Sequence, residues 1–360
     1  MNLEELSQQT CEWLRGDGAQ SDIVMSTRIR LARNLGDYPF IRRCTDIDRA
    51  NIECYLRGQL AGRAEFATLQ HVDIDSLDEI DRRFLVERQL ISRELAEGEG
   101  ARSVLVDPAE RLSLMINEED HVRMQIMRSG LELDAAWEAI NRWDDILQES
   151  VNVAFHDRWG YLTACPTNVG TGMRVSVMVH LPALVMTRQI DRVFKSLQKI
   201  SLAVRGLFGE GSQAMGDFYQ ISNQLTLGKS EHGLLEQVGE VVPALIEYEH
   251  KAREFLLNND REGLVRQVHE SLDALRRSNQ ISSEETMHLL SRLRMGIHLK
   301  LIDDIDLSTV NRIFLLTQPA HIQKLQGAPL TVEERNRHRA EYLQVALASL
   351  GNGHTPPTTS

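Results

Sequence analysis

The sequence predicts an α+β protein in which an antiparallel sheet flanked by helices is followed by a C-terminal all-helical domain. Two observations lead to this fold class. Segments of the first half alternate apolar and polar residues with the period of two that marks half-buried strands, whereas the apolar spacing after about residue 241 has the helical period. The chain has 360 residues, of which 42% are hydrophobic, and this length suffices for two cores.

The strand pattern occurs in four segments, at residues 23–31, 103–106, 111–117 and 174–181. In the first of them Arg28 and Arg30 share a polar face, opposite isoleucine, methionine and leucine side chains. In the last, Arg174 lies on the polar face in the same way. The two middle segments flank Asp107-Pro108-Ala109-Glu110 and predict a hairpin. Strands with one apolar and one basic face are typical of an antiparallel sheet that is covered on one side.

The helical spacing occurs in four later segments, at residues 245–258, 261–278, 284–302 and 332–350. Two of these segments begin with a capping-box pattern, which starts at Ser282 and at Thr331. We therefore expect four parts: an N-terminal segment (1–20), a catalytic domain (21–250), a helical domain (251–350) and a disordered tail (351–360).

Composition narrows the function classes. The net charge of −12 gives no reason to expect nucleic acid or an anionic membrane as a partner. No apolar run approaches the ~18 residues of a membrane span, and residues 1–16 lack the layout of a signal peptide. The four cysteines (Cys11, Cys44, Cys54 and Cys165) form no CxxC pair, which argues against a zinc ribbon or a dithiol centre. We expect a cytoplasmic protein.

Two familiar site patterns are incomplete. Leu227-Gly228-Lys229-Ser230 resembles the end of a P-loop, but Asn223 stands where the first glycine of that loop is needed. His269-Glu270 lacks the second histidine of an HExxH zinc site. Neither segment predicts a nucleotide or metal site, and we expect no protein-held metal.

Three other segments carry grouped polar chemistry. They are the acidic segment Asn117–Arg123 (NEEDHVR), the small-residue loop Cys165–Arg174 (CPTNVGTGMR) and the glycine-hinged segment Arg205–Gly211 (RGLFGEG). Taken singly, they are also explained as a solvated turn, an inert buried cysteine and a mobile surface turn. Taken together, they bring arginines, carboxylates and a thiol to one proposed site.

Such a site suits phosphoryl transfer to a cationic acceptor. Arg28, Arg30, Arg123, Arg174 and Arg205 could surround a polyphosphate through charge-assisted hydrogen bonds. No lysine precedes Lys195, so an oxyanion site in the first half must use guanidinium groups; codon bias also explains this composition. Glu119, Glu210 and Cys165 would supply the negative charge for a cation such as a guanidinium.

The sequence resembles the ATP:guanido phosphotransferases (phosphagen kinases) and, within them, the bacterial protein arginine kinases. The resemblance rests on Ser26-Thr27-Arg28-Ile29-Arg30 and on the three segments above, and it runs from about Ser21 through the helical domain. It implies a guanidino-kinase catalytic domain, ATP with Mg²⁺, and alignment of an in-line transfer.

The resemblance assigns roles to matching positions. Glu119 resembles the carboxylate that orients the guanidinium and acts as the base, and Glu210 resembles its partner carboxylate. Cys165 matches the family cysteine, and nearby arginines would lower the pKa of its thiol. The implied ATP contacts are Ser26, Thr27, Arg28, Ile29, Arg30, Gln89, Arg123, Arg174, Val175, Ser176, Val177, Met178, Arg205, Gly206, Leu207, Phe208, Gly209 and Glu210. Gln89 departs from the family, which tends to place a histidine there.

The helical domain resembles the family in a second motif. Arg335, Asn336, Arg339 and Ala340 match an Arg-Asp-x-x-Arg-Ala pattern that is implied to bind phosphoarginine allosterically, and Asn336 replaces its aspartate. Arg335 and Arg339 lie on one helix face near the N-terminus, where the macrodipole favours an anion. A charged solvent face is the alternative explanation.

The length of the segment before the first arginine motif indicates the class of substrate. Kinases of this family that act on small guanidino compounds carry a helical domain before the first arginine motif, whereas 25 residues precede Ser26 here. We therefore expect an open acceptor side and arginine side chains of proteins as substrates. The alternatives are a small-molecule guanidino kinase and a non-catalytic phosphoarginine-binding adaptor. The resemblance further implies a homodimer, a zinc-bearing activator, and marking of proteins for a Clp-type unfoldase and protease.

Overall fold

A single antiparallel sheet forms the centre of the molecule in the computed structural model, which describes residues 2–206, 215–303 and 305–348. Its eight strands follow the order β2-β3-β4-β5-β1-β8-β10-β9, and every neighbouring pair is antiparallel. The strands are β1 (Val24–Arg33), β2 (Gln70–Asp73), β3 (Ser103–Val106), β4 (Leu112–Ile116), β5 (Val122–Ser129), β8 (Met173–His180), β9 (Leu202–Gly206) and β10 (Phe218–Asn223). A separate hairpin consists of β6 (Phe155–His156) and β7 (Gly160–Tyr161). The predicted antiparallel sheet is confirmed.

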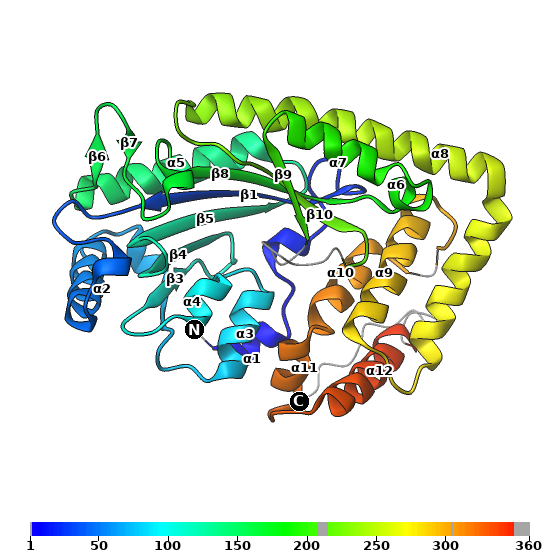
Figure 1. Cartoon of the computed structure of the whole chain (residues 1–360). Coiled ribbons are helices and arrows are strands. Elements are labelled where there is room, and N and C mark those ends of the chain that lie inside the picture. Colours follow the sequence, from blue (N-terminus) through cyan, green and yellow to red (C-terminus); the bar gives the residue numbers. More distant parts are fainter. Residues whose placement is uncertain (1, 207–214, 304, 349–360) are drawn as a thin grey trace.

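Helices surround this sheet and then form a C-terminal group (Figure 1). The first seven are α1 (Leu3–Ser7), α2 (Asp46–Ala61), α3 (Glu79–Glu87), α4 (Arg93–Glu97), α5 (Leu133–Ser150), α6 (Pro182–Met186) and α7 (Ile190–Lys199). The later ones are α8 (Glu231–Arg277), α9 (Ser283–His298), α10 (Leu307–Leu316), α11 (Pro319–Gln326) and α12 (Val332–Ala348). The predicted all-helical C-terminal part is therefore confirmed.

The covered face of the sheet packs on α5 and on the first part of α8 (Figure 1). Ile29 of β1 and Val175 and Val177 of β8 are fully buried on this side, as their apolar positions in the alternation predict. Because α5 and α8 cover this face, the opposite face, which bears the arginines, points toward the α3–α4 segment and the N-terminal segment. This division of the sheet positions the site described below.

Helix α8 differs from the prediction. It begins at Glu231, earlier than the first predicted helix, and it joins the segments 245–258 and 261–278. At Asp260 the backbone leaves helical geometry (φ −152°, ψ 58°), and the Asp260 carboxylate accepts from the Gly263 amide at 2.9 Å. The chain bends there (Figure 1), so the predicted polar break exists as a kink rather than as a loop.

Two short helices, α10 and α11, were missing from the prediction. They have 10 and 8 residues, too few for a clear helical period. Asp306 caps α10 by accepting from the Thr309 amide, and Pro319 begins α11. The predicted capping box at Thr331 is confirmed, because Thr331 and Glu334 exchange hydrogen bonds.

The N-terminal segment packs between the sheet and α10. Trp13 lies in a 3₁₀ turn (Glu12–Leu14), is 2% exposed and meets Phe314 of α10 edge to face. Asn311 of α10 donates to the Leu14 carbonyl at 2.9 Å. The segment thus joins the two predicted domains.

The predicted boundary between residues 250 and 251 falls inside α8, and the division into domains stays a prediction. The predicted tail (351–360) lies outside the described residues. Within the described part of the chain, the helices are too short or too polar for any of them to cross a membrane.

Candidate active site

Cross-strand register gathers the predicted arginines on the open face of the sheet. Arg30 of β1 stands opposite Arg174 of β8 and opposite Gln125 of β5. Residues directly opposite each other in antiparallel strands share a face, so Arg30 and Arg174 are neighbours. Arg205 of β9 stands opposite Gln220 of β10, which continues the same face. Arginines separated by more than a hundred positions in the sequence therefore meet on one surface.

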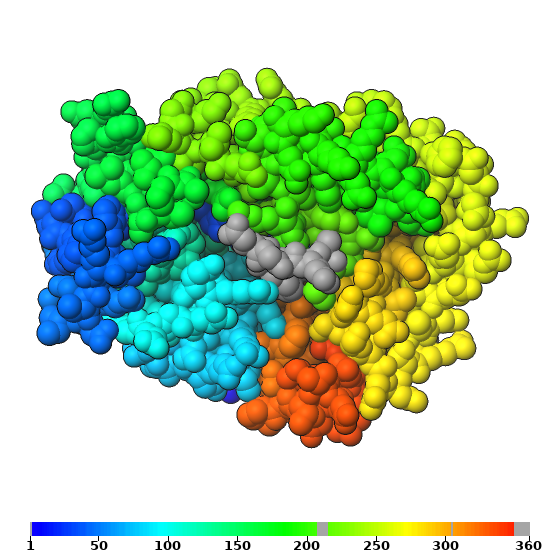
Figure 2. Space-filling model, viewed as in Figure 1, coloured from blue at the N-terminus to red at the C-terminus, as the bar shows by residue number. Residues whose placement is uncertain are grey.

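This face forms the floor of a cleft of about 670 Å³. All five predicted arginines line it, and so do Gln89, Glu119 and Cys165. The α3–α4 segment supplies another wall, through residues such as Ser92 and Arg93. Figure 2 shows the surface hollowed between the cyan segment that holds α3 and α4 and the green segment that holds β8 and β9. The site residues predicted from separate segments thus share one cavity.

Mutual repulsion among the arginines makes the cleft strongly receptive to anions. Burial and the charges of Arg174 and Arg123 together lower the pKa of Arg28 to about 10. Burial and the neighbouring arginines also lower the pKa of Arg30, well below its ordinary value. Both groups remain charged at neutral pH only at a cost in free energy. A bound polyanion would remove that cost, which is the electrostatic signature of a phosphate site.

The acidic segment lies at the other end of the cleft. Glu118 is 6% exposed, accepts from Ser92 Oγ at 2.6 Å and forms an ion pair with Arg123. Glu119 reaches Arg123 at 3.4 Å and the exposed Arg42 at 3.8 Å. Partial burial raises the pKa of Glu119, which Arg123 opposes. A carboxylate of raised pKa beside a phosphate site suits proton transfer.

Asp120 and His121 have structural roles. Asp120 is fully buried and accepts from Asn34 Nδ2 at 2.6 Å and from the Ala164 amide at 2.7 Å. Its carboxylate therefore holds the backbone next to Cys165. The His121 Nδ1 accepts from the Leu35 amide at 2.9 Å. Of the three acids in the segment, Glu119 alone combines partial exposure with a position in the cleft.

Cys165 lies at the start of its loop, half-buried, with its sulfur 3.0 Å from the Thr167 hydroxyl. Thr226 fixes this loop, because its single hydroxyl proton is shared between the Thr167 and Val169 carbonyls, which lie 2.8 and 2.7 Å from the hydroxyl oxygen. A thiol so placed faces the same cleft as Glu119.

Not every predicted ATP contact faces the cleft. The side chains of Thr27, Ile29, Val175 and Val177 are buried on the opposite face, so only their backbone could approach a ligand. Ser26, Ser176 and Met178 line a smaller pocket beside the cleft, and buried Gly206 ends β9. Leu207, Phe208, Gly209 and Glu210 lie outside the described residues.

Sequence reasoning missed several residues that line the cleft, among them Arg42, Glu118, Gln125 and Gln220. Gln125 shares the face of Arg123 in β5 by simple alternation, which was a usable signal. Gln220 lies in a strand (Phe218–Asn223) that the sequence analysis did not identify. Arg42 belongs to a 3₁₀ turn whose place beside Glu119 depends on tertiary contacts.

The second predicted site lies in α12, outside the cleft. Arg339 is 1% exposed and donates to the Thr317 and Ile281 carbonyls and to Asn336 Oδ1 at 2.7, 2.9 and 2.8 Å. Arg335 is half-buried and donates to the Leu330 carbonyl at 2.9 Å, and Ala340 is fully buried. The amide of Asn336 thus already has an internal partner in Arg339.

Family models match most of the chain. The model described as ATP:guanido phosphotransferase, C-terminal catalytic domain, matches residues 54–252. The model described as Protein-arginine kinase McsB C-terminal domain matches residues 261–357. The first match spans β2 to β10 but not β1 with Arg28 and Arg30, and the second covers the helical part with α12.

Curated relatives match over nearly their whole length. A protein-arginine kinase of Halothermothrix orenii is 41% identical over 96% of this chain and 99% of its own. A protein-arginine kinase of Bacillus licheniformis is 40% identical over 98% of each chain.

Among solved structures, the duplicated taurocyamine kinase of Schistosoma mansoni matches with a TM-score of 0.60 and 26% identity, over 65% of this chain and 34% of that one. Lombricine kinase matches with a TM-score of 0.57 and 26% identity, over 68% and 71%.

Proposed function

This chain belongs to the ATP:guanido phosphotransferase family, among its protein-arginine kinases, and we propose from that premise that its cleft transfers the γ-phosphoryl group of ATP to arginine side chains of proteins. The observation that carries the proposal is the convergence of five arginines with Glu119 and Cys165 in one cleft. Positive charge at one end suits the triphosphate, and negative charge at the other suits a guanidinium.

The arginines are proposed to hold the triphosphate. The charges of Arg174 and Arg123 lower the pKa of Arg28, and those of Arg28, Arg123 and Arg174 lower the pKa of Arg30, so these groups lie close together. Each guanidinium offers several N–H donors in a fixed plane, so the phosphate oxygens would be held in orientation as well as in position. Orientation matters because an in-line displacement gains most of its rate from alignment of the reacting atoms.

Glu119 is proposed to be the base. It would accept a hydrogen bond from the target guanidinium, turn one nitrogen toward the γ-phosphorus and take up its proton. The N–P bond then forms as the bond to the β-phosphate oxygen breaks, and ADP leaves. Cys165 would face the same guanidinium, and Glu210 is proposed as the second carboxylate from the family resemblance. Fixed charges that are aligned before reaction lower the barrier more than mobile water does.

Mg²⁺ is proposed to arrive with ATP. The residues described here include no group of three histidine, cysteine or acidic side chains that could hold a metal ion. Glu118 and Glu119 are engaged with Arg123, so the phosphate oxygens and water would be the main ligands, as Mg²⁺ prefers. When bound, the ion would offset charge on the phosphates.

The activity test offers ATP with either an arginine-containing protein or free arginine. We expect ADP release and acid-labile phosphate on arginine side chains of the protein, read by mass spectrometry. Glu119→Gln should lower the rate of both signals by about 10²–10⁴ in a folded protein. Phosphorylation of free arginine alone would favour the small-molecule kinase. Binding of phosphoarginine without ADP release from any acceptor would favour the adaptor.

The remaining expectations are proposals that rest on the family resemblance. We propose a homodimer formed through the helical part, a zinc-bearing activator, a cytoplasmic location, and marking of substrates for a Clp-type unfoldase. We also propose that Arg335, Asn336, Arg339 and Ala340 form the phosphoarginine site, where Arg339 would support the helix ends and Arg335 would meet the ligand. Light scattering of the purified chain tests the dimer, and phosphoarginine titration of Arg335→Ala tests the second site.

A further inference from the structure

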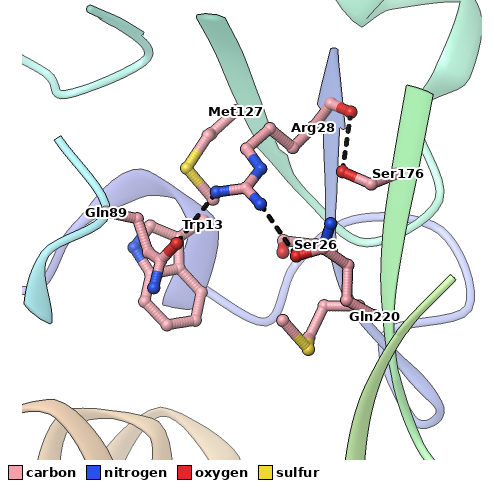
Figure 3. Close-up of a pocket in the computed structure, with 8 residues that line it drawn as sticks. Trp13, Ser26, Arg28, Gln89, Met127, Ser176 and Gln220 are labelled. Carbon is pink, nitrogen blue, oxygen red and sulfur yellow. Dashed lines mark hydrogen bonds between the residues drawn. The ribbon is translucent and has the colours of Figure 1, made fainter. Parts of the chain in front are cut away.

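Arg28 lines both the cleft and a smaller adjoining pocket, and Figure 3 shows the residues around that smaller pocket. Two glutamines, Gln89 and Gln220, share this position, since they line both cavities. Gln89 follows α3, and Gln220 lies in β10, so the two amides approach Arg28 from different parts of the fold. Figure 3 shows both side chains pointing toward the guanidinium.

The two amides clamp the guanidinium. Arg28 Nη1 donates to Gln89 Oε1 at 2.9 Å, and Arg28 Nη2 donates to Gln220 Oε1 at 2.8 Å. The glutamines are themselves restrained. The backbone carbonyl of Gln89 accepts a hydrogen bond from Gln125 Nε2. Gln220 is 2% exposed and stands between Met178 and Arg205, its partners in the two neighbouring strands.

The clamp is neutral, unlike the partners of other arginines nearby. Arg123 meets Glu118 and Glu119, and buried Arg88 forms a bidentate pair with Glu110 at 2.7 Å. Within the described part of the chain, Arg28 forms no ion pair. An amide oxygen fixes the plane of a guanidinium but leaves its full positive charge to a ligand, whereas a carboxylate would neutralise it.

We propose that Gln220 is a positioning residue for nucleotide binding, which holds Arg28 in orientation by a neutral hydrogen bond and thereby keeps its charge available to phosphate. The inference rests on the proposed function, because Arg28 must meet ATP. It adds a residue that neither the sequence analysis nor the family resemblance singled out.

Replacement of the amide by an acid of equal size tests the clamp. Gln220→Glu keeps the acceptor oxygen but adds a negative charge beside Arg28. We expect the KM for ATP to rise about tenfold, the scale of one charge-assisted hydrogen bond, while kcat and the KM for the protein acceptor change by less than about threefold. The matched control is Gln323→Glu, a buried amide of α11 that does not line the cleft, which should leave the KM for ATP unchanged.

A double-mutant cycle separates positioning from direct contact. In an Arg28→Met background, Gln220→Glu should have no further effect on the KM for ATP, because its effect passes through Arg28. Equal effects with and without Arg28 would mean that Gln220 touches the nucleotide itself, and the proposal would be wrong. An unchanged KM for ATP in folded Gln220→Glu would also overturn it.

Two further arms keep the test decisive. Thermal unfolding of each variant shows whether it is folded. If Gln220→Glu does not fold, Gln220→Met replaces it in the test. We expect a similar rise in the KM for ATP from Gln220→Met, because the hydrogen-bond acceptor for Arg28 is lost. No rise in that variant would overturn the proposal. Failure of the wild-type chain to bind ATP at all would instead refute the proposed function.

Discussion

Arg28 in the cleft and Arg339 in α12 both belong to arginine-rich motifs, yet their guanidinium groups are held differently. Arg339 is 1% exposed, and its guanidinium donates hydrogen bonds to two backbone carbonyls and to Asn336. Arg28 donates to two glutamine amides at the edge of an open cleft. Arg339 therefore joins the ends of helices, whereas Arg28 keeps its charge for a ligand.

The neighbours of each arginine reinforce this difference. Arg30 stands directly opposite Arg174, an arrangement that destabilises an empty sheet because like charges repel. Burial and Arg335 lower the pKa of Arg339 to about 10, but its hydrogen bonds are satisfied inside the protein. A motif of arginines thus predicts charge, while the acceptors around it decide between ligand binding and structural support.

The largest expected effect comes from the acidic end of the cleft. Glu119→Gln should lower kcat by about 10²–10⁴, the usual contribution of a general base, with substrate binding retained. ADP release under saturating ATP measures this effect. A kcat within threefold of the wild-type value would contradict the assigned role.

Glu119 also determines the direction in which stability and activity change with pH. Because burial raises the pKa of Glu119 above its ordinary 4.5, the folded protein binds this proton more readily than the unfolded chain does. Stability contributed by the protonated form is lost as pH rises through the folded pKa, so Glu119→Gln should be slightly more stable at neutral pH. Activity should decline as pH falls through that same value, and a kcat–pH profile with its acid limb at 4.5 or below would contradict this.

Removal of Arg339 should affect stability most. Arg339→Met leaves the Thr317 and Ile281 carbonyls without their donor, and we expect a loss of about 2–4 kcal/mol in the free energy of unfolding. Denaturant unfolding measures it. Arg337→Met, whose side chain is 54% exposed, is the control and should change stability by less than about 0.5 kcal/mol.

The corresponding change in the cleft should have the opposite outcome. Arg30→Met removes a repelling charge, so stability should stay equal or rise, while the KM for ATP should increase by about 10–100-fold. Unfolding and ATP titration on the same sample separate the two effects. A stability loss as large as that of Arg339→Met would erase the contrast between the two regions.

The smallest effect concerns the joint between the regions. Glu87 accepts from the Ala320 and His321 amides at 2.7 and 3.0 Å, so α3 caps α11 two residues before Gln89. Glu87→Gln should cost about 0.5–1.5 kcal/mol of stability, because one acceptor is lost. Calorimetry tests this, and an unchanged melting temperature would show that the cap is energetically neutral.

Local pattern predicted much of this protein. Alternation in residues 23–31 and 174–181 placed Arg28 and Arg30 on the polar face of one strand and Arg174 on the polar face of another, and the pairing of β1 with β8 puts all three on one face of the sheet. Local pattern was insufficient for α10 and α11, which depend on contacts with Trp13 and Glu87 rather than on their own periodicity.

The sequence by itself determined the kinds of side chain available and the face of each strand on which they stand, since both follow from local backbone geometry. Tertiary structure decided their partners. Gln220 lies 192 positions from Arg28, and the Ile281 carbonyl that accepts from Arg339 lies 58 positions from it. Such pairings depend on which surfaces pack together, because the free energy of a buried charge is set by the atoms around it and not by its neighbours along the chain.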